Sequence, residues 1–268
     1  IDAALIEDIG FCDLTSELVI PREATAELAL NARHEMVIAG IDIAGQVFRR
    51  RVPDCRFEKR VDDGARVAAG TRLAVVTGHA QGLLTAERTA LNLLQHLSGI
   101  ATLTRRFVDA VRGTGAAILD TRKTTPAWRR VEKYAVRCGG GVNHRGDLAS
   151  AVLIKDNHLA AVDGDVAIAI RRVREYADST IAIQVECDSP AQVHVAVAER
   201  ADSVLLDNMS LVMLRECVGI AKGKCVTEAS GGVRLDTVRA IAETGVDRIS
   251  VGALTHSAPA LNLALDFE

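Results

Sequence analysis

Two adjacent cations, Arg122 and Lys123, follow an apolar run in this 268-residue chain. Residues 118–129 read ILDTRKTTPAWR, so the basic pair stands where a buried strand should end. The whole chain carries a formal net charge of -3, so the pair does not belong to a general positive field. Two interpretations follow: a solvated basic loop, or a strand end that holds an anion.

Further basic side chains stand at comparable points. The stretch GGGVNHR carries His144 and Arg145, and the apolar run in SAVLIKDNH ends at Lys155. A single basic residue at a strand end is usually solvated or salt-bridged. Several unpaired positive charges in one concave site are unfavourable unless an anion compensates them. The cluster therefore favours a site for a small, multiply charged anion.

Carboxylates and glycines end the later apolar runs. Glu186 and Asp207 stand where an apolar residue would have sufficed. They could be counter-ions for the cations, or they could hold ribose hydroxyls or a magnesium ion bound through water and a substrate phosphate. Glu228 and Ser230 lead into ASGGV, and the last run leads into SVGA. Glycine turns with exposed N–H groups, followed by a helix N-terminus, suit a phosphate.

Six short apolar runs would position these residues. They are rich in β-branched residues and read AAILDTRK (116–123), SAVLIKDNH (150–158), IAIQVECD (181–188), DSVLLDNMS (202–210), KCVTEASGG (224–232) and DRISVGAL (247–254). The last four runs lie about 22 residues apart, with helix-compatible stretches between them. Repeated strand–helix units predict a parallel sheet that curls into an α/β barrel. The carboxyl ends of barrel strands form one rim, where catalytic residues lie.

The first hundred residues show a different pattern. ATAELALNARHEMVIAG and RVDDGARVAAGTRLAVVTG alternate apolar and polar residues between Gly and Asp turns, as antiparallel strands do. LLTAERTALNLLQHLSGIATLTRRFVDAVRG reads as one or two long helices. We therefore predict a first domain over residues 1–100 and a barrel domain over residues 101–258. The tail, 259–268, is expected to return to the sheet of the first domain.

Composition argues against several classes of function. No apolar run is long enough for a membrane helix. The mildly acidic balance and 3% aromatic residues argue against nucleic-acid binding, which needs a positive field and stacking platforms. The six cysteines contain no C-x-x-C pair, so we expect neither a zinc site nor a disulfide framework. Reduced thiols indicate a cytoplasmic protein.

The motifs resemble those of a known family. EDIGFCDLTS, TAERTALNLLQHLSGIAT, DTRKTTP, GGGVNHR, LIKDNH, VEC, LLDNMS and EASGG are similar, in this order, to motifs of the quinolinate phosphoribosyltransferases, the carboxylating nicotinate-nucleotide pyrophosphorylases. One departure is Cys12, where the family usually has a glycine. The resemblance implies an N-terminal α/β sandwich domain followed by an incomplete, open parallel α/β barrel.

The resemblance also implies a reaction. Quinolinate and 5-phosphoribosyl-1-pyrophosphate (PRPP), with Mg²⁺, would give nicotinate mononucleotide, pyrophosphate and CO₂ in NAD biosynthesis. It further implies a homodimer, alone or within a higher oligomer, whose active sites are shared between subunits.

Site residues are implied position by position. The quinolinate set comprises Arg88 from the neighbouring subunit, Thr121, Arg122, His144, Arg145 and Lys155. The PRPP set comprises Lys123, Lys155, Asn157, His158, Glu186, Asp207, Ser230, Gly231, Gly232, Val251, Gly252 and Ala253. Catalytic roles fall on Lys123, Glu186 and Asp207, and the two carboxylates also hold Mg²⁺, directly or through water. The residue types agree, because guanidinium groups can fork onto the carboxylates of a pyridine dicarboxylate.

Two other functions stay open. A related phosphoribosyltransferase acting on nicotinate or another ring acid, including the molybdenum-transport type, would share most motifs, although a monocarboxylate does not need all of Arg88, Arg122, Arg145 and Lys155. The stretch RVDDGARVAAGTRLAVVTG also resembles the barrel-sandwich pattern of biotinyl and lipoyl carriers. Such carriers need a lysine at a hairpin tip, and none occurs between Arg60 and Gly82.

Overall fold

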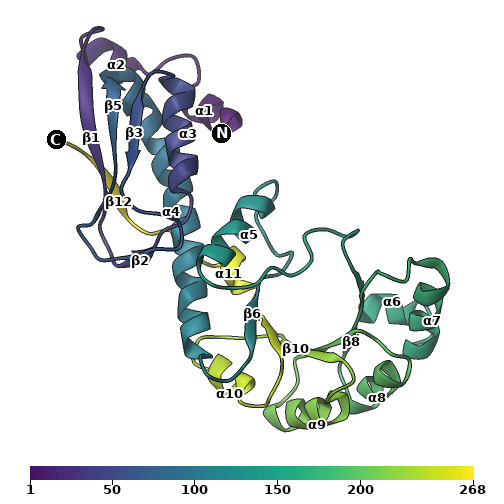
Figure 1. Cartoon of the computed structure of the whole chain (residues 1–268). Coiled ribbons are helices and arrows are strands. Elements are labelled where there is room, and N and C mark those ends of the chain that lie inside the picture. The colour runs from purple at the N-terminus through teal and green to yellow at the C-terminus, as the bar shows by residue number, and fades with distance from the viewer. The chain divides into compact units, whose positions relative to one another are not determined.

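The computed structural model describes residues 1–268, and the chain forms two compact units (Figure 1). The first unit comprises Ile1–Arg105, Val131–Gly140 and Ser257–Glu268. The second unit comprises Arg106–Arg130 and Gly141–His256.

A four-stranded antiparallel sheet, in the order β12-β1-β5-β3, lies at the centre of the first unit. Its strands are β1 (Thr25–Ala32), β3 (Arg56–Lys59), β5 (Arg72–His79) and β12 (Leu263–Phe267). A separate pair joins β2 (Met36–Val37) to β4 (Arg66–Val67). Leu28 lies opposite Phe267, and Ala32 lies opposite Leu263, so the C-terminal segment forms an edge strand of this sheet.

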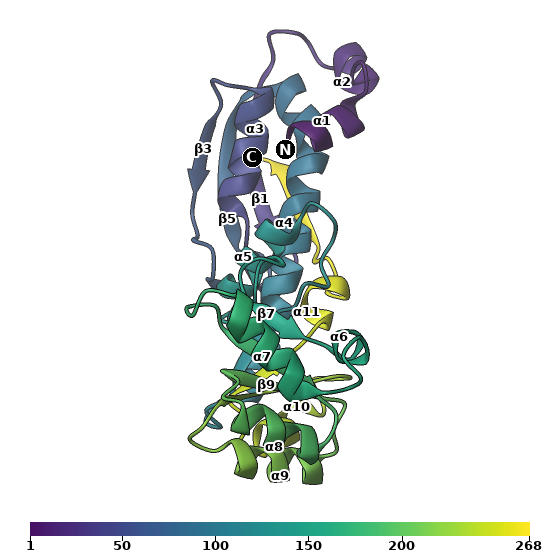
Figure 2. The same cartoon turned by 90° about the vertical axis from the view of Figure 1, so that its right-hand side faces the viewer.

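The helices of the first unit include one unusually long element. They are α1 (Asp2–Ile9), α2 (Leu14–Val19), α3 (Ile41–Arg51), α4 (Ala80–Ala110) and α5 (Arg129–Cys138), of which α4 and α5 extend into the second unit. The stripe of Leu91, Leu94, Leu97 and Ile100 along α4 is almost completely buried, as the sequence period requires. Figures 1 and 2 show α3 and α4 lying against one face of the sheet.

The second unit is a curved parallel sheet in the order β6-β11-β10-β9-β8-β7. The strands are β6 (Ala117–Leu119), β7 (Val152–Ile154), β8 (Ile183–Cys187), β9 (Ser203–Asp207), β10 (Val226–Ser230) and β11 (Arg248–Ser250). β6 and β7 form the two edges, so the barrel is open between them. All six predicted apolar runs are strands.

Helices cover the outer side of this sheet (Figure 1). They are α7 (Val166–Tyr176), α8 (Pro190–Ala198), α9 (Leu211–Ala221) and α10 (Val238–Ala242). Two short helices, α6 (Asp156–Ala160) and α11 (Ala253–His256), follow the carboxyl ends of β7 and β11. Asp165 and Ser210 start α7 and α9 by accepting backbone N–H bonds from Ile168 and Met213. Pro190 at the first turn of α8 needs no N–H partner.

The predicted fold class is confirmed: an antiparallel α/β unit is joined to an open parallel α/β barrel. The structure adds that α4 is one continuous helix and that Val131–Gly140 belongs to the first unit. Within that unit, Glu132 on α5 is fully buried and lies 2.8 Å from His96 Nε2. No helix has the length and apolar composition needed to cross a membrane.

Candidate active site

A cavity of about 890 Å³ opens at the carboxyl ends of the barrel strands. Each strand contributes inward-facing residues two positions apart, because side chains alternate along a strand. The rim carries Lys155, Glu186, Asp207, Ser230 and Gly252. One layer deeper, the strands carry Leu153, Gln184, Leu205, Glu228 and Ser250. All of these residues except Gln184 line the cavity itself.

Asp120 explains the aspartate in DTRK. It is fully buried at the end of β6 and accepts hydrogen bonds from Asn143 Nδ2 at 2.5 Å and from the backbone N–H of His144 at 2.8 Å. A buried carboxylate that accepts such bonds is a rigid anchor. Asp120 thus ties the loop that carries His144 and Arg145 to the segment after β6 that carries Arg122.

Arg122 and Arg145 face the same part of the cavity without a carboxylate partner. Arg145 donates to the carbonyl of Ala151 at 3.1 Å. Burial, followed by the nearby charge of Arg122, lowers the pKa of Arg145 below its ordinary value. Arg122 Nε is buried without a hydrogen-bond partner. Two repelling guanidinium groups, one of them incompletely satisfied, are the arrangement expected of an anion site.

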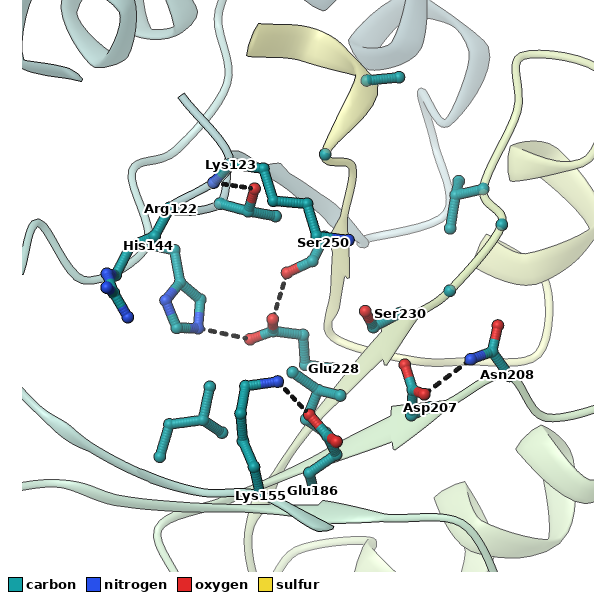
Figure 3. A pocket seen from close by; sticks show the side chains of 18 of the residues that line it. Arg122, Lys123, His144, Lys155, Glu186, Asp207, Asn208, Glu228, Ser230 and Ser250 are labelled. Atoms are coloured by element: carbon teal, nitrogen blue, oxygen red, sulfur yellow. Dashed lines mark hydrogen bonds and ion pairs between the residues drawn. The ribbon is translucent and has the colours of Figure 1, made fainter. Parts of the chain in front are cut away.

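Lys155 and Glu186 form an ion pair on neighbouring strands. Lys155 Nζ donates to Glu186 Oε2 at 2.6 Å, and the lysine side chain is 45% exposed (Figure 3). The exposed ammonium keeps further donors for a ligand. This pair connects the cationic side of the cavity to the acidic side.

Asp207 is held by the residue that follows it. Asn208 has a left-handed backbone with φ of 53°, and its side-chain amide donates to Asp207 Oδ2 at 2.7 Å (Figure 3). Its backbone N–H donates to the carbonyl of Ser230 at 2.9 Å. Gly231 makes room for Asn208, since a Cβ on Gly231 would lie 2.1 Å from Asn208 Oδ1. Asn208 therefore links the glycine turn at Gly231 to the carboxylate of Asp207.

Lys123 is held beside the last glycine of the rim. Its backbone N–H donates to Thr121 Oγ1 at 3.0 Å, and its carbonyl accepts from Thr255 Oγ1 at 2.7 Å. A Cβ on Gly252 would come within 3.2 Å of both Lys123 Cδ and His256 Nε2. The missing side chain at position 252 allows this ammonium group to approach the turn.

The acidic side fits a metal ion only together with a substrate. Glu186 and Asp207 end the neighbouring strands β8 and β9. No group of three or more His, Cys, Asp or Glu side chains is arranged to hold a metal. Mg²⁺ is usually held by one or two carboxylates, several waters and substrate phosphates. The donor set therefore fits a magnesium ion that enters with a pyrophosphate group.

The structure brings thirteen of the seventeen predicted site residues together around one cavity. These are Thr121, Arg122, Lys123, His144, Arg145, Lys155, Glu186, Asp207, Ser230, Gly231, Gly232, Gly252 and Ala253. Four lie elsewhere. Arg88 is exposed on α4 in the first unit, and Val251 is buried with 1% exposure. Asn157 and His158 are exposed on α6, where His158 Nδ1 accepts the backbone N–H of Lys155 and caps the helix.

The cavity is also lined by Leu153 and by seven further residues that were not in the predicted set. They are Leu205, Asn208, Glu228, Val233, Arg234, Ser250 and His256. Glu228 and Ser250 stand two positions before Ser230 and Gly252, so strand alternation alone could have placed them on the inner face. Arg234 forms a solvent-exposed ion pair with Asp236 at 3.0 Å. His256 lies at the end of α11, one helical turn after Gly252. The alternating pattern of the strands therefore does not predict that it lines the cavity.

The fold and the site together define a barrel enzyme that binds anionic small molecules at its rim. Comparisons with known proteins identify the family. The family model described as "Quinolinate phosphoribosyl transferase, C-terminal domain" matches residues 100–266, and that described as "Quinolinate phosphoribosyl transferase, N-terminal domain" matches residues 13–98. The chain therefore belongs to the quinolinate phosphoribosyltransferase family, and the family recognised from its motifs is confirmed.

Individual relatives match along nearly their whole length. The chain is 46% identical over 271 residues to a nicotinate-nucleotide pyrophosphorylase [carboxylating] of Mycobacterium leprae, covering 98% of this chain and 94% of that protein. The solved nicotinate-nucleotide pyrophosphorylase of Ehrlichia chaffeensis superposes with a TM-score of 0.95 at 41% identity, covering 100% and 97%. NadC from Streptococcus pyogenes superposes with a TM-score of 0.96 at 38% identity, covering 100% and 95%.

Proposed function

We propose that this chain transfers the phosphoribosyl group of PRPP to the ring nitrogen of quinolinate and releases the 2-carboxylate as CO₂. The products are nicotinate mononucleotide, pyrophosphate and CO₂, and the reaction belongs to NAD biosynthesis. Family membership and the activities for which the relatives are named support this proposal. The single observation in the site that carries it is the pair of guanidinium groups, Arg122 and Arg145, that face one cavity without a carboxylate partner.

Quinolinate occupies the cationic side of the cavity in this proposal. Its two carboxylates lie on adjacent ring carbons, and planar guanidinium groups can bind each of them in a forked geometry. Arg122 and Arg145 make these contacts, with His144 and Thr121 beside them and Lys155 between the two substrates. Fixing the ring in this way directs its nitrogen toward the acidic side, where the sugar binds.

PRPP occupies the acidic and glycine-rich side. Backbone N–H groups of the turn at Ser230, Gly231 and Gly232 hold the 5-phosphate, as do those near Gly252. Lys123 faces the pyrophosphate and offsets the negative charge that grows as this group leaves. Glu186 and Asp207 lie where the ribose carbon acquires positive charge, and their carboxylates stabilise it.

A magnesium ion is part of the proposal. Glu186 and Asp207 would hold it, directly or through water, together with the pyrophosphate oxygens, and it would supply charge neutralisation for the leaving group. After transfer, the ring nitrogen is quaternary and withdraws electrons, so the adjacent 2-carboxylate leaves as CO₂. The electron pair left on C2 then takes up a proton from water. No side chain of the site needs to act as a strong base in this sequence of steps.

We further propose that the chain works as a homodimer, alone or within a larger assembly, and that Arg88 enters the partner's cavity. Arg88 is exposed on α4. Beside it on α4, Thr85 and Thr89 bond to Asp13 and Asp8 of the N-terminal segment. That segment exposes a group of large apolar side chains: Ile6, Phe11, Leu14, Leu18 and Val19, with Phe11 91% exposed. Such a patch marks a protein interface.

We also propose that the enzyme works in the cytoplasm. All six cysteines are free thiols, and three of them are buried. Free thiols in a chain of this size suit a reducing compartment.

One assay tests the function directly. Purified protein is incubated with PRPP, Mg²⁺ and quinolinate labelled in its 2-carboxylate, and both nicotinate mononucleotide and labelled CO₂ are measured. Nicotinate replaces quinolinate in a parallel reaction. Product from nicotinate but none from quinolinate would favour a related transferase that acts on a monocarboxylate. Absence of both products would count against phosphoribosyl transfer to a pyridine acid.

A further inference from the structure

A buried carboxylate faces the cavity from below the rim. Glu228 on β10 is 0% exposed, yet it lines the cavity. It accepts hydrogen bonds from Ser250 Oγ and, at 2.9 Å, from Gln184 Nε2, and His144 Nε2 lies 3.5 Å from its Oε2 (Figure 3). The roles proposed above for the other residues do not use this carboxylate.

Packing alone does not require a charge at this position. Leu153 and Leu205 occupy the same inner layer on β7 and β9, so an apolar side chain suits the layer. Burying an ionised carboxylate is unfavourable unless it is paired and hydrogen-bonded. No lysine or arginine pairs with Glu228, and its one ionisable hydrogen-bond partner is His144. The carboxylate is therefore best understood through its effect on His144.

The contacts determine which nitrogen of His144 carries a proton. Nε2 lies 3.0 Å from Gln184 Oε1 and 3.5 Å from Glu228 Oε2. The orientation of the Gln184 amide is set, because its NH₂ group donates to Glu228. Both groups opposite Nε2 are acceptors, so Nε2 must carry a proton. His144 also lines the cavity, where a ligand would meet it.

We propose that Glu228 is a positioning residue for the ring acid: with Gln184, it fixes His144 with Nε2–H directed inward, so that Nδ1 can donate to a carboxylate of quinolinate. This inference rests on the proposed function. A carboxylate ligand requires a second N–H at Nδ1, and Glu228 balances the charge of the imidazolium that results. Carboxylate partners orient metal-ligating histidines in the same way, by accepting a bond from the second ring nitrogen.

The ionisation of Glu228 agrees with this role. Burial acts to raise its pKa, but the hydrogen bond and charge of His144, followed by the bonds from Ser250 and Gln184, lower the pKa below its ordinary value. The carboxylate is therefore charged at neutral pH and available to compensate an imidazolium.

Glu228→Gln tests the proposal, since it keeps the shape and removes the charge. The KM for quinolinate and the KM for PRPP are measured separately. We expect the quinolinate KM to rise roughly 10- to 100-fold, by analogy with the loss that follows removal of a group that orients a metal-ligating histidine. We expect the PRPP KM to change by less than about threefold, because the glycine turns that hold PRPP do not contact Glu228.

Glu132→Gln is the matched control. Glu132 is the second fully buried glutamate that bonds a histidine, His96, and it lies outside the cavity. It should lower thermal stability without a selective change in the quinolinate KM. Equal quinolinate defects in both variants would reduce the role of Glu228 to general stability and would overturn the proposal.

A spectroscopic measurement keeps the proposal testable if Glu228→Gln does not fold. Histidine side chains are labelled with ¹⁵N in the wild-type protein, and the His144 signals are assigned by comparison with a His144→Gln variant. We expect a protonated Nε2 before and after quinolinate is added. A bare Nε2 with a proton on Nδ1 would contradict the proposed geometry. Gln184→Met, which removes the shared acceptor and keeps the carboxylate, should raise the quinolinate KM by less than Glu228→Gln does.

The failure of this inference differs from the failure of the proposed function. Wild-type protein that makes nicotinate mononucleotide, together with Glu228→Gln protein whose quinolinate KM is unchanged, would overturn the inference alone. Wild-type protein that neither binds nor converts quinolinate would overturn the proposed function, and with it the ligand named for Nδ1.

Discussion

Gly231 and Asn208 approach so closely that a single Cβ on Gly231 would lie 2.1 Å from Asn208 Oδ1. Gly231 also has a φ of 95°, in the region that side-chain-bearing residues rarely adopt. Because Asn208 holds Asp207 through a 2.7 Å hydrogen bond, the glycine turn and the carboxylate must move together. The glycine turn to which we assign the phosphate and the carboxylate to which we assign the ribose are therefore coupled through Gly231.

Gly231→Ala should disable the site, and Gly232→Ala should do less harm. Alanine at 231 meets the Asn208 side chain and backbone, and displacement of Asp207 by about 1 Å can lower activity roughly 100-fold. A Cβ at Gly232 meets no atom within 4 Å, so that variant suffers mainly the strain of a φ of 57°. Steady-state kinetics of the two variants make the comparison, and equal losses would show that Asn208 does not transmit the effect.

Arg145→Ala should weaken quinolinate binding and leave the fold intact. Loss of a buried charged contact to a carboxylate costs roughly 2–5 kcal/mol, which is at least about 30-fold in Kd. Stability should not fall, because the substitution relieves repulsion with Arg122. Calorimetric titration with quinolinate and a thermal melt measure both quantities. An unchanged Kd would remove Arg145 from the quinolinate site.

Site residues could be predicted from the sequence where the signal lies in the neighbouring residues of the chain. Each rim residue ends an apolar run, so Lys155, Glu186 and Asp207 could be placed from the chain alone. Glu228 and Ser250 could also have been placed on the inner face, by counting two positions back from Ser230 and Gly252. The hydrogen bond between them joins two strands and has no local signal. His158 has the same local signal as Lys155, but a helix start after β7 uses its side chain as a cap.

Sequence-based prediction could not show that most of α5 belongs to the first unit. No local pattern reveals that Glu132 will meet His96 or that Tyr134 will meet Asp63, because these partners lie 36 and 71 positions away. Such pairs are chosen by tertiary packing after the strands and helices exist. The boundary expected near residue 100, inside the long helical stretch, lies within α4, which also contains the division between the two units at Arg105 and Arg106.

Tyr134→Phe should destabilise the protein without impairing catalysis. Tyr134 Oη donates to Asp63 Oδ2 at 2.6 Å, and Asp63 also accepts the backbone N–H groups of Gly40 and Ile41 at the start of α3. Burial, followed by the bond to Asp63, raises the pKa of the Tyr134 phenol. Losing one such bond costs about 1–2 kcal/mol. Tyr176→Phe is the control, since Tyr176 is 82% exposed. Denaturant unfolding measures the stability of both variants. Equal free energies of unfolding would contradict the predicted role of the Tyr134 hydrogen bond.

Glu228 should stabilise the fold in a pH-dependent manner. Its folded-state pKa lies below the ordinary 4.5, so the ionised carboxylate favours the folded state. That contribution is present in full above about pH 4.5 and is lost as the pH falls through the lower folded-state value. The difference in free energy of unfolding between wild type and Glu228→Gln should therefore shrink between pH 7 and pH 3.5. A difference that does not change with pH would mean that the folded-state pKa is not lowered.

Mixing two inactive variants tests whether Arg88 serves the partner's cavity. If each site combines Arg88 of one subunit with Lys155 of the other, a dimer of one Arg88→Ala and one Lys155→Ala subunit contains one intact site. Random reassembly makes half of the dimers mixed, so about a quarter of wild-type activity should return. Lys155→Ala mixed with Arg145→Ala is the control, because both residues line the same cavity within one chain and no intact site can form. No recovery in the first mixture would place Arg88 in its own subunit's site or outside the site altogether. Recovery in the control would show that regained activity does not report an intact shared site.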